Sequence, residues 1–188
     1  MRELVYYVAA GLDGCIAGPD GQFDAFSTEG DHMADLARFA DALPTDGAEH
    51  LGIAQPCTGF DTVLMGWNTY AVGLPGTVSP YRHLRQIVFS RNHTADAENL
   101  EVTAADPVES VRELKRQPGA DIWLCGGGTL ASLLSGEIDR IVVKRHPVLF
   151  GAGIPMFAPG TYLPTVFDVA DTRTFGSGVS VTEYVRRR

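Results

Sequence analysis

Short, nearly continuous apolar runs recur along the chain and predict the strands of a buried sheet. The first run, residues 4–10, is almost entirely apolar and rich in β-forming residues, which is typical of a strand covered on both faces. We therefore expect it near the centre of the sheet. Shorter runs predict further strands over residues 62–65, 86–90, 100–103, 122–125 and 140–145.

Helical spacing of apolar residues appears between these runs. Residues 31–43 carry one apolar face, with Asp31 placed to cap the helix and Pro44 following its end. That face consists of Met33, Leu36, Ala37, Phe39, Ala40 and Leu43. Asp106 and Pro107 open another helix, because Asp caps free amides and Pro fits the first helical position. Short helices are expected over 66–72 and 129–135, whereas 45–59 has no clear period and is expected to be a surface excursion.

The end of the chain predicts an antiparallel pair of strands. Residues 165–175 and 179–185 flank the turn sequence Gly176-Ser177-Gly178. Strands alternate with helices before this hairpin, which favours an α/β fold with a three-layer arrangement: a mainly parallel central sheet with an antiparallel edge. We expect one domain over residues 1–188.

Composition narrows the classes of function. The 188 residues carry a net charge of -8, and the basic residues are scattered apart from the last three, so a nucleic-acid partner is not expected. No apolar run approaches the ~20 residues of a membrane span, and the first residues enter a strand pattern rather than a signal peptide, which predicts a cytoplasmic protein without membrane contact. Cys15, Cys57 and Cys125 lie far apart, so we expect reduced, buried thiols and no metal site.

Three consecutive glycines follow the expected strand 122–125. Gly126, Gly128 and Ala131 satisfy the G-x-G-x-x-G/A spacing of turns that bind a dinucleotide pyrophosphate. A Rossmann assignment fails on position, because such a turn follows the first strand and has an acidic residue about 20 positions later. A tight turn that needs positive φ is the alternative explanation. The motif alone therefore leaves both explanations open.

Four segments taken together carry a family resemblance: "VAAGLDGCIAG" from residue 8, "VLMGWNTYAVG" from residue 63, "IVFSRN" from residue 87, and the glycine triplet. In this order the chain resembles the dihydrofolate reductase superfamily. It is most similar to the C-terminal reductase domain of the riboflavin-pathway deaminase-reductase, given "LDGCIAG" and the later "HPVLFGAGIPMF". The resemblance covers nearly the whole chain except 45–59.

The resemblance implies NADPH binding at the carboxyl ends of the strands. Two turns would grip the pyrophosphate, one at Gly66, Trp67, Asn68 and Thr69, the other at Gly126, Gly127, Gly128, Thr129 and Leu130, the second often with a cis bond between its first two glycines. Positions that match nicotinamide contacts are Val8, Ala9, Ile16 and Ala17.

The adenosine 2′-phosphate is expected near the end of the strand 86–90. By the resemblance, Ser90 and Arg91 would hold it, since a guanidinium binds phosphate through two parallel hydrogen bonds. A solvated loop charge is the alternative for Arg91. Trp67 stands where many relatives have Arg, which weakens the preference for NADPH over NADH.

The proton donor is the open question. The segment 34–39, "ADLARF", resembles the folate-site helix of dihydrofolate reductases, in which an acid at the position of Asp35 would assist protonation. Asp35 falls at the edge of the apolar face, where a partly buried carboxylate can have a raised pKa, although a solvated flank is the alternative. Glu29 and Asp31 are other possible acids. We expect His32, His83 and His146 to be structural or surface residues.

These observations predict an NADPH-dependent reductase of a small heterocyclic substrate, pyrimidine-like or pterin-like. One alternative is a true dihydrofolate reductase that uses Asp35. Another is a nucleotide-binding protein on the same fold without turnover. From the riboflavin-pathway resemblance we also expect a homodimer, with residues 140–145 and the apolar segment 147–157 near the contact.

Overall fold

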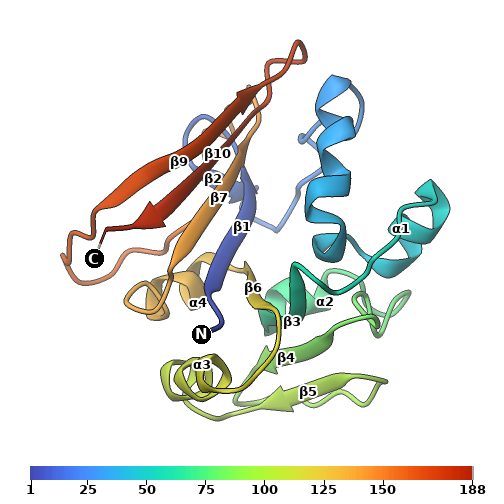
Figure 1. Cartoon of the computed structure of the whole chain (residues 1–188), viewed down its shortest axis with the longest axis vertical. Helices are drawn as coiled ribbons and strands as arrows, with labels where there is room; N and C mark the ends of the chain where they lie inside the picture. The colour runs from blue at the N-terminus through green and yellow to red at the C-terminus, as the bar shows by residue number, and fades with distance from the viewer. Residues whose placement is uncertain (188) are drawn as a thin grey trace.

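A computed structural model describes residues 1–187, and an eight-stranded sheet forms its centre (Figure 1). The order of the strands is β5-β4-β3-β6-β1-β7-β10-β9. Their bounds are β1 Leu4–Ala10, β3 Phe60–Gly66, β4 Arg85–Phe89, β5 Leu100–Thr103, β6 Asp121–Gly126, β7 Arg140–Arg145, β9 Phe167–Thr174 and β10 Ser180–Arg186. The six strands from β5 to β7 pair in parallel, and the hairpin β9–β10 adds the antiparallel edge. The predicted fold class is confirmed.

β1 lies inside the sheet, as its continuous apolar sequence predicts. It pairs with β6 on one side and β7 on the other, and Leu4, Val5 and Tyr6 have no exposed surface. β7 is equally internal, because β10 covers its second edge. Residues 140–145, expected near a homodimer contact, therefore have no free strand edge to offer a partner, since the hairpin occupies that edge. Within the described residues the sheet ends at β5 and β9.

Helices cover both faces of the sheet and complete the three layers. On one face α3 (Pro107–Arg116) and α4 (Gly128–Leu133) pack with Leu4, Tyr6 and Val8 of β1. On the other face η1 (Asp31–Ala42) and α2 (Trp67–Ala71) pack around Val5 and Trp123. Asp106 caps α3 by accepting hydrogen bonds from the amides of Val108 and Glu109, as predicted.

The helix expected over 31–43 forms, but as a 3₁₀ helix with a different start. Gly30 occupies the N-cap position, and no side chain caps the helix. The carboxylate of Asp31 instead accepts hydrogen bonds from the amides of Gly176 and Ser177, at 2.6 and 3.0 Å. The predicted capping role of Asp31 is wrong because this carboxylate ties η1 to the turn of the β9–β10 hairpin.

The expected excursion over 45–59 contains a helix, α1 (Thr45–Leu51). Its buried residues are Thr45 and Ala48, whereas Leu51 is 54% exposed. A helix that buries one small and one polar residue shows no apolar repeat, so the pattern could not reveal it. Pro44 thus marks the start of α1 as well as the end of η1.

A second, two-stranded sheet lies beyond the main one. β2 (Cys15–Ala17) pairs antiparallel with β8 (Ile154–Pro155), which brings the early glycine-rich loop to the late apolar segment. Asp13 secures this contact because its carboxylate accepts from the amides of Phe150 and Gly151, both at 2.9 Å. These hydrogen bonds also hold the pKa of Asp13 below its usual range. Among residues 1–187, no helix has the length and apolarity that a membrane span requires.

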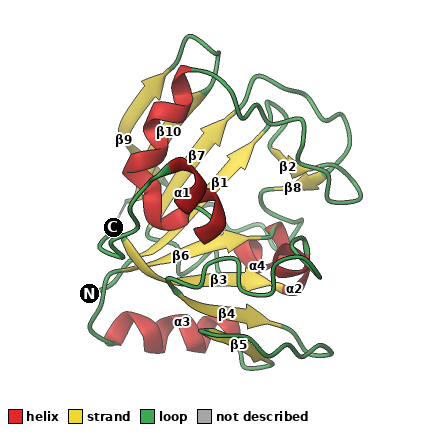
Figure 2. Cartoon of the chain, turned by 90° about the vertical axis from the view of Figure 1, so that its right-hand side faces the viewer, coloured by secondary structure: helices red, strands yellow, loops and turns green. Residues whose placement is uncertain are grey.

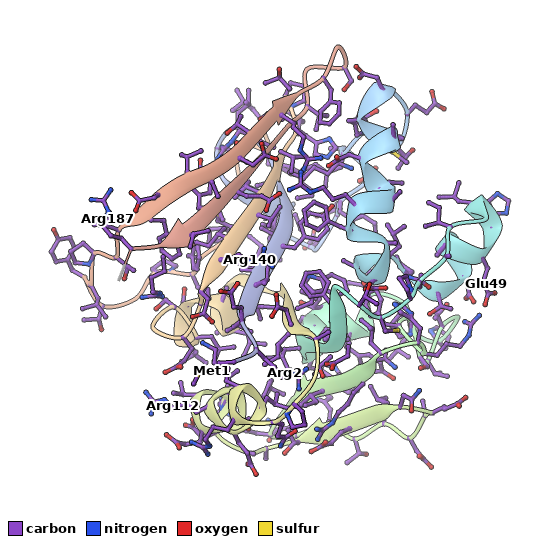
Figure 3. All side chains as sticks on the ribbon, viewed as in Figure 1. Met1, Arg2, Glu49, Arg112, Arg140 and Arg187 are labelled. Carbon is purple, nitrogen blue, oxygen red and sulfur yellow. The ribbon has the colours of Figure 1, made fainter. Side chains whose placement is uncertain are left out.

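Charged side chains lie both at the periphery of the molecule and nearer its middle. Figure 3 shows Arg112, Arg187 and Glu49 at its periphery, while Arg140 lies nearer its middle. There the guanidinium of Arg140 pairs with Glu3 at 2.9 Å and Asp121 at 3.0 Å. This pairing joins the amino ends of β1, β6 and β7, opposite the end at which the glycine turns lie.

Candidate cofactor and substrate site

The two glycine-opened turns predicted to bind a pyrophosphate lie against each other. β3 and β6 are parallel neighbours, so their carboxyl ends meet at one edge, where α2 and α4 begin (Figure 2). A Cβ atom built on Gly66 would lie 3.8 Å from the carbonyl oxygen of Gly126 and from the amide nitrogen of Gly127. A Cβ built on Gly127 would lie 3.3 Å from Thr69 Oγ1. The missing side chains therefore allow the two turns to approach each other backbone to backbone.

The three consecutive glycines have three different structural roles. Gly126 has φ 132°, a left-handed conformation that side chains disfavour, and its bond to Gly127 is cis, as the resemblance implied. Gly127 faces Thr69 of the other turn. Gly128 is a packing position, because a Cβ there would lie 2.1 Å from the carbonyl oxygen of Pro155. Only Gly127 thus combines an ordinary backbone conformation with a position between the two turns.

The residues expected at the nicotinamide end lie at the carboxyl end of β1 and in β2. Val8 is buried in the core on the side of α3 and α4, so only its backbone is available there. Ala9 is half-buried on the opposite face, and Ile16 and Ala17 are half-buried in β2. Leu130 of the second turn is also a core residue, 5% exposed, whereas Thr129 is exposed.

The expected 2′-phosphate residues follow β4, beside the first turn. Ser90 Oγ accepts hydrogen bonds from the amides of Asn92 and His93, which folds the loop back on itself. Arg91 is exposed and forms no ion pair with any residue in 1–187. The ring of His93 stacks on Trp67, with centroids 4.2 Å apart and planes 6° apart. Trp67 therefore supports the loop that carries Arg91.

Asp35 lies on the inner side of η1 rather than on a solvated flank. Its side chain is 14% exposed and forms an ion pair with Arg173 of β9. Arg173 also pairs with Asp171 at 3.2 Å, and Arg38 of η1 pairs with Asp171 at 2.9 Å and with Glu183. A guanidinium in contact favours the ionised carboxylate, so Asp35 is here a charged anchor between η1 and the hairpin.

The other acids considered are less suited to a buried pocket. Glu29 is exposed, and the two backbone amides on Asp31 hold the pKa of that carboxyl below its usual range.

The cysteines are free but half-buried rather than fully buried. Burial raises the pKa of Cys125 to about 12, so this thiol stays protonated near neutral pH.

Of the three histidines expected to be structural or surface residues, two have both ring nitrogens paired. His83 is structural, since its ring nitrogens pair with Thr45 Oγ1 at 2.8 Å and with the carbonyl of Asp41 at 3.0 Å. His32, 1% exposed, pairs with Ser177 Oγ at 2.9 Å and with the carbonyl of Ser27 at 3.2 Å. His146 differs, because it is 2% exposed and its Nδ1 atom has no partner among the described residues.

Sequence reasoning missed Lys144, which lies under η1 beside these groups. Lys144 lines one pocket, too narrow to hold a water molecule, with Tyr7, His32, Asp35, Leu36 and Val181. Burial lowers the pKa of Lys144, and burial, together with Lys144 and His32, lowers the pKa of His146 to about 4. The sequence gave one signal, because Lys144 comes two residues after the buried Val142 and therefore projects from the same face of β7.

Comparison with known proteins agrees with this geometry. Residues 2–181 match the RibD C-terminal domain family. Two Bacillus subtilis proteins, the uncharacterized proteins YwjB and YyaP, are 30% and 28% identical to the chain. The YwjB match covers 98% of both chains, and the YyaP match covers 95% of this chain and 92% of its relative.

Solved structures show the same fold at lower identity. A protein of Shewanella sp. PV-4, described as a riboflavin biosynthesis protein, is 20% identical with a TM-score of 0.73 over the whole of both chains. A Thermotoga maritima diaminohydroxyphosphoribosylaminopyrimidine deaminase/5-amino-6-(5-phosphoribosylamino)uracil reductase is 17% identical with a TM-score of 0.66, over 99% of this chain and 57% of that one. A dihydrofolate reductase from Enterococcus faecalis, complexed with NADP(H), is 14% identical with a TM-score of 0.62, over 99% of this chain and 97% of that one.

The match over residues 2–181, with the arrangement of strands and glycine turns, identifies the family. The chain has a dihydrofolate reductase-like fold and belongs to the RibD C-terminal domain family.

Proposed function

We propose that the protein is an NADPH-dependent reductase of a small heterocyclic substrate. The observation that carries the proposal is the close approach of two turns without side chains, at Gly66 and Gly127, at the carboxyl ends of two parallel strands. Ligands of open α/β sheets bind at such strand ends, and unpaired backbone amides suit a pyrophosphate. Family membership and the NADP(H) complex of a protein with the same fold support this assignment.

The residues present fit the cofactor along its length. The turns 66–69 and 126–130 offer backbone amides to the pyrophosphate, and Ser90 and Arg91 lie beside β4 for a 2′-phosphate. Ala9, Ile16 and Ala17 border the expected nicotinamide end. When bound, NADPH supplies a hydride for the substrate, while the protein provides orientation and a pocket with little water.

The chain orients this site through contacts between distant segments. Asp13 holds the loop 11–18 against residues 150 and 151, and β2 pairs with β8. On the other side of β1, η1 covers Tyr7, whose ring stacks on Phe39 with centroids 4.5 Å apart. The substrate is thereby expected between η1 and the carboxyl end of β1.

NADPH binding is the first test of the proposal. We expect millimolar NADPH to raise the unfolding temperature of the purified protein, because a ligand that binds only the folded state stabilises it by mass action. NADH is expected to stabilise it less. If the unfolding temperature rises with neither NADPH nor NADH, the proposed function is wrong.

Arg91→Ala should separate NADPH from NADH. An exposed guanidinium that meets a 2′-phosphate contributes a charge-assisted hydrogen bond, so we expect the Kd for NADPH to rise roughly 10-fold, with little change for NADH. Titration calorimetry with both nucleotides measures this difference. Arg85→Ala is the control, because Arg85 is half-exposed and already paired with Glu101 at 2.9 Å. Equal loss for both nucleotides in Arg91→Ala would place the 2′-phosphate elsewhere.

The ion pair of Asp35 disfavours the alternative of a true dihydrofolate reductase. If Asp35 were the acid of such an enzyme, Asp35→Asn would lower dihydrofolate turnover by ~10²- to 10⁴-fold. We instead expect the wild-type protein to reduce dihydrofolate barely, in an assay of NADPH absorbance. Robust turnover that collapses in Asp35→Asn would establish the folate reaction. NADPH binding without reduction of any small heterocycle would favour the nucleotide-binding alternative.

The homodimer stays a proposal. Leu149 and Ile154 in the segment 147–157 are 68% and 37% exposed, which supports an apolar contact there. Light scattering at micromolar concentration tests it, and a strictly monomeric mass would contradict it.

A further inference from the structure

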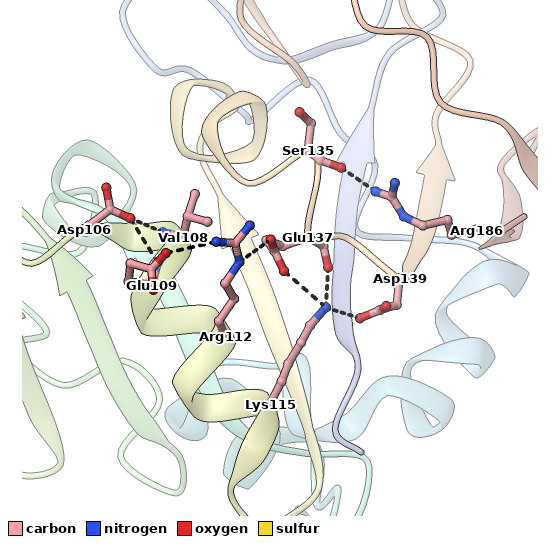
Figure 4. A network of polar contacts seen from close by, with 9 residues as sticks. All are labelled: Asp106, Val108, Glu109, Arg112, Lys115, Ser135, Glu137, Asp139 and Arg186. Carbon is pink, nitrogen blue, oxygen red and sulfur yellow. Dashed lines mark hydrogen bonds and ion pairs between the residues drawn. The ribbon is translucent and has the colours of Figure 1, made fainter. Parts of the chain in front are cut away.

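The chain contains only two lysines, and their surroundings differ sharply. Lys115 and Lys144 stand alone among basic residues that are otherwise arginines. Figure 4 shows Lys115 in a network in which its Nζ atom donates to the carbonyl of Glu137 and pairs with Asp139, both at 2.6 Å. Lys144 is half-buried, and its ammonium forms no hydrogen bond or ion pair with any residue from 1 to 187. Its charge is thus removed from part of its water without compensation, which costs free energy unless a ligand supplies a partner.

The position of Lys144 relates it to the expected nicotinamide end. Lys144 is the register partner of Ala9 on β1 and of Val181 on β10. Side chains at paired positions of neighbouring strands project from the same face of a sheet. Lys144 therefore emerges on the face of Ala9, beneath η1, where the substrate is expected.

The acids near Lys144 are already engaged by arginines. Asp35 pairs with Arg173, and Glu183 pairs with Arg38. The remaining neighbours are Tyr7, which is uncharged because burial raises its pKa to about 12, and two histidines. Among residues 1–187 no carboxylate forms an ion pair with the ammonium of Lys144, although Asp35 lines the same pocket.

A second group beside Lys144 also lacks a partner. The ring of His146 lies 5.6 Å from that of His32, which lines the same pocket as Lys144. His146 is 2% exposed, yet its Nδ1 atom is unpaired within the described chain. Buried polar atoms in folded proteins almost always have partners, so an orphan next to an unpaired ammonium indicates a place for a polar ligand.

We propose that Lys144 is the cation that binds a carbonyl or carboxylate oxygen of the substrate, beside the nicotinamide end of the cofactor. This assignment rests on the proposed reductase function, because it locates the substrate by reference to the cofactor. It makes the pocket selective for hydrogen-bond acceptors and anions. Lys144 would repel a protonated aminopyrimidine. Asp35 would not offset this repulsion, because its carboxylate is already paired with Arg173.

The scarcity of lysine makes a direct test practical. Reductive methylation of the full-length protein with ¹³C-formaldehyde labels only Lys115, Lys144 and the amino terminus, and dimethylation keeps their charges. Lys144→Met and Lys115→Arg assign the two side-chain NMR signals. The probes share one ring: orotate presents two carbonyl oxygens and a carboxylate, and 2,4-diaminopyrimidine presents amino groups.

With NADP⁺ present, we expect orotate to shift the Lys144 signal saturably and to leave the Lys115 signal in place. 2,4-Diaminopyrimidine should shift neither. By calorimetry, Lys144→Met should weaken orotate binding by roughly 10- to 100-fold, the usual effect of one charged hydrogen bond, while NADP⁺ affinity stays the same. Lys115→Arg should bind orotate like the wild type.

The outcomes separate this assignment from the reductase proposal. If the protein binds NADP⁺ but orotate does not change the chemical shift of the Lys144 signal, the proposed role of Lys144 is wrong. The proposed cofactor site is then unaffected. An equal shift with 2,4-diaminopyrimidine would also overturn it. If orotate shifts the Lys144 signal saturably but the protein binds no NADP⁺, the proposed role of Lys144 is supported and the proposed reductase function is wrong.

Discussion

Gly127→Val is expected to abolish NADPH binding in a protein that still folds. Gly127 has φ -90° and ψ -166°, an extended conformation that any residue adopts, so the backbone itself tolerates the change. Its side chain would lie between the two turns, where a Cβ alone would already be 3.3 Å from Thr69 Oγ1. We expect the Kd for NADPH to rise at least ~100-fold, which corresponds to about 2.7 kcal/mol.

Gly136→Val is the matched control for this substitution. Gly136 follows α4, and nothing lies within 4 Å of a Cβ built there. It should bind NADPH like the wild type in the same calorimetric titration. A folded Gly127→Val protein with unchanged affinity would show that the glycines serve only the turn.

Gly128→Ala is expected to act on stability before it acts on binding. The new Cβ would lie 2.1 Å from the carbonyl oxygen of Pro155, a backbone atom that other contacts hold in place. Ala158 donates its amide to the carbonyl of Gly128 at 3.1 Å, and Tyr6 donates its hydroxyl to the carbonyl of Met156 at 2.8 Å. Overpacking of this kind costs about 2–3 kcal/mol, which lowers Tm by roughly 5–10 °C in a chain of this size.

Thermal unfolding without nucleotide measures the effect of Gly128→Ala, with Gly136→Ala as control. The control should unfold within about 2 °C of the wild type, because its Cβ meets no atom. Equal unfolding temperatures for Gly128→Ala and the wild type would mean that residues 155–158 move away freely. The two adjacent glycines therefore give opposite signatures, one in binding and one in stability.

Local signals in the sequence were sufficient to predict the two glycine turns that we propose bind the cofactor. The strands at 62–65 and 122–125 are each followed by glycine, so each bare turn can be predicted locally, whereas their placement side by side depends on the pairing of β3 with β6. The hairpin after residue 165 and the cap at Asp106 are equally local, and the structure confirms both. Motifs of this kind depend on neighbouring residues, so they can be read without knowledge of tertiary contacts.

The region proposed for the substrate depends on contacts that the sequence cannot show. Asp35 meets Arg173 only because the hairpin packs on η1, and the same packing diverts Asp31 from its predicted cap. Lys144 is notable because it is the register partner of Ala9 and because its ammonium has no carboxylate partner among residues 1–187. α1 was missed because it buries Thr45 and Ala48, which carry no helical apolar repeat.

A crystal structure with NADP⁺ is the most direct test of the reductase assignment. We expect the pyrophosphate between the turns, within hydrogen-bonding distance of backbone amides in 67–69 and 128–130. The nicotinamide ring should lie against Ala9, Ile16 and Ala17, on the side of β1 that Lys144 shares. NADP⁺ bound elsewhere on the protein, or crystals soaked to saturation with no nucleotide between Gly66 and Gly127, would contradict the account.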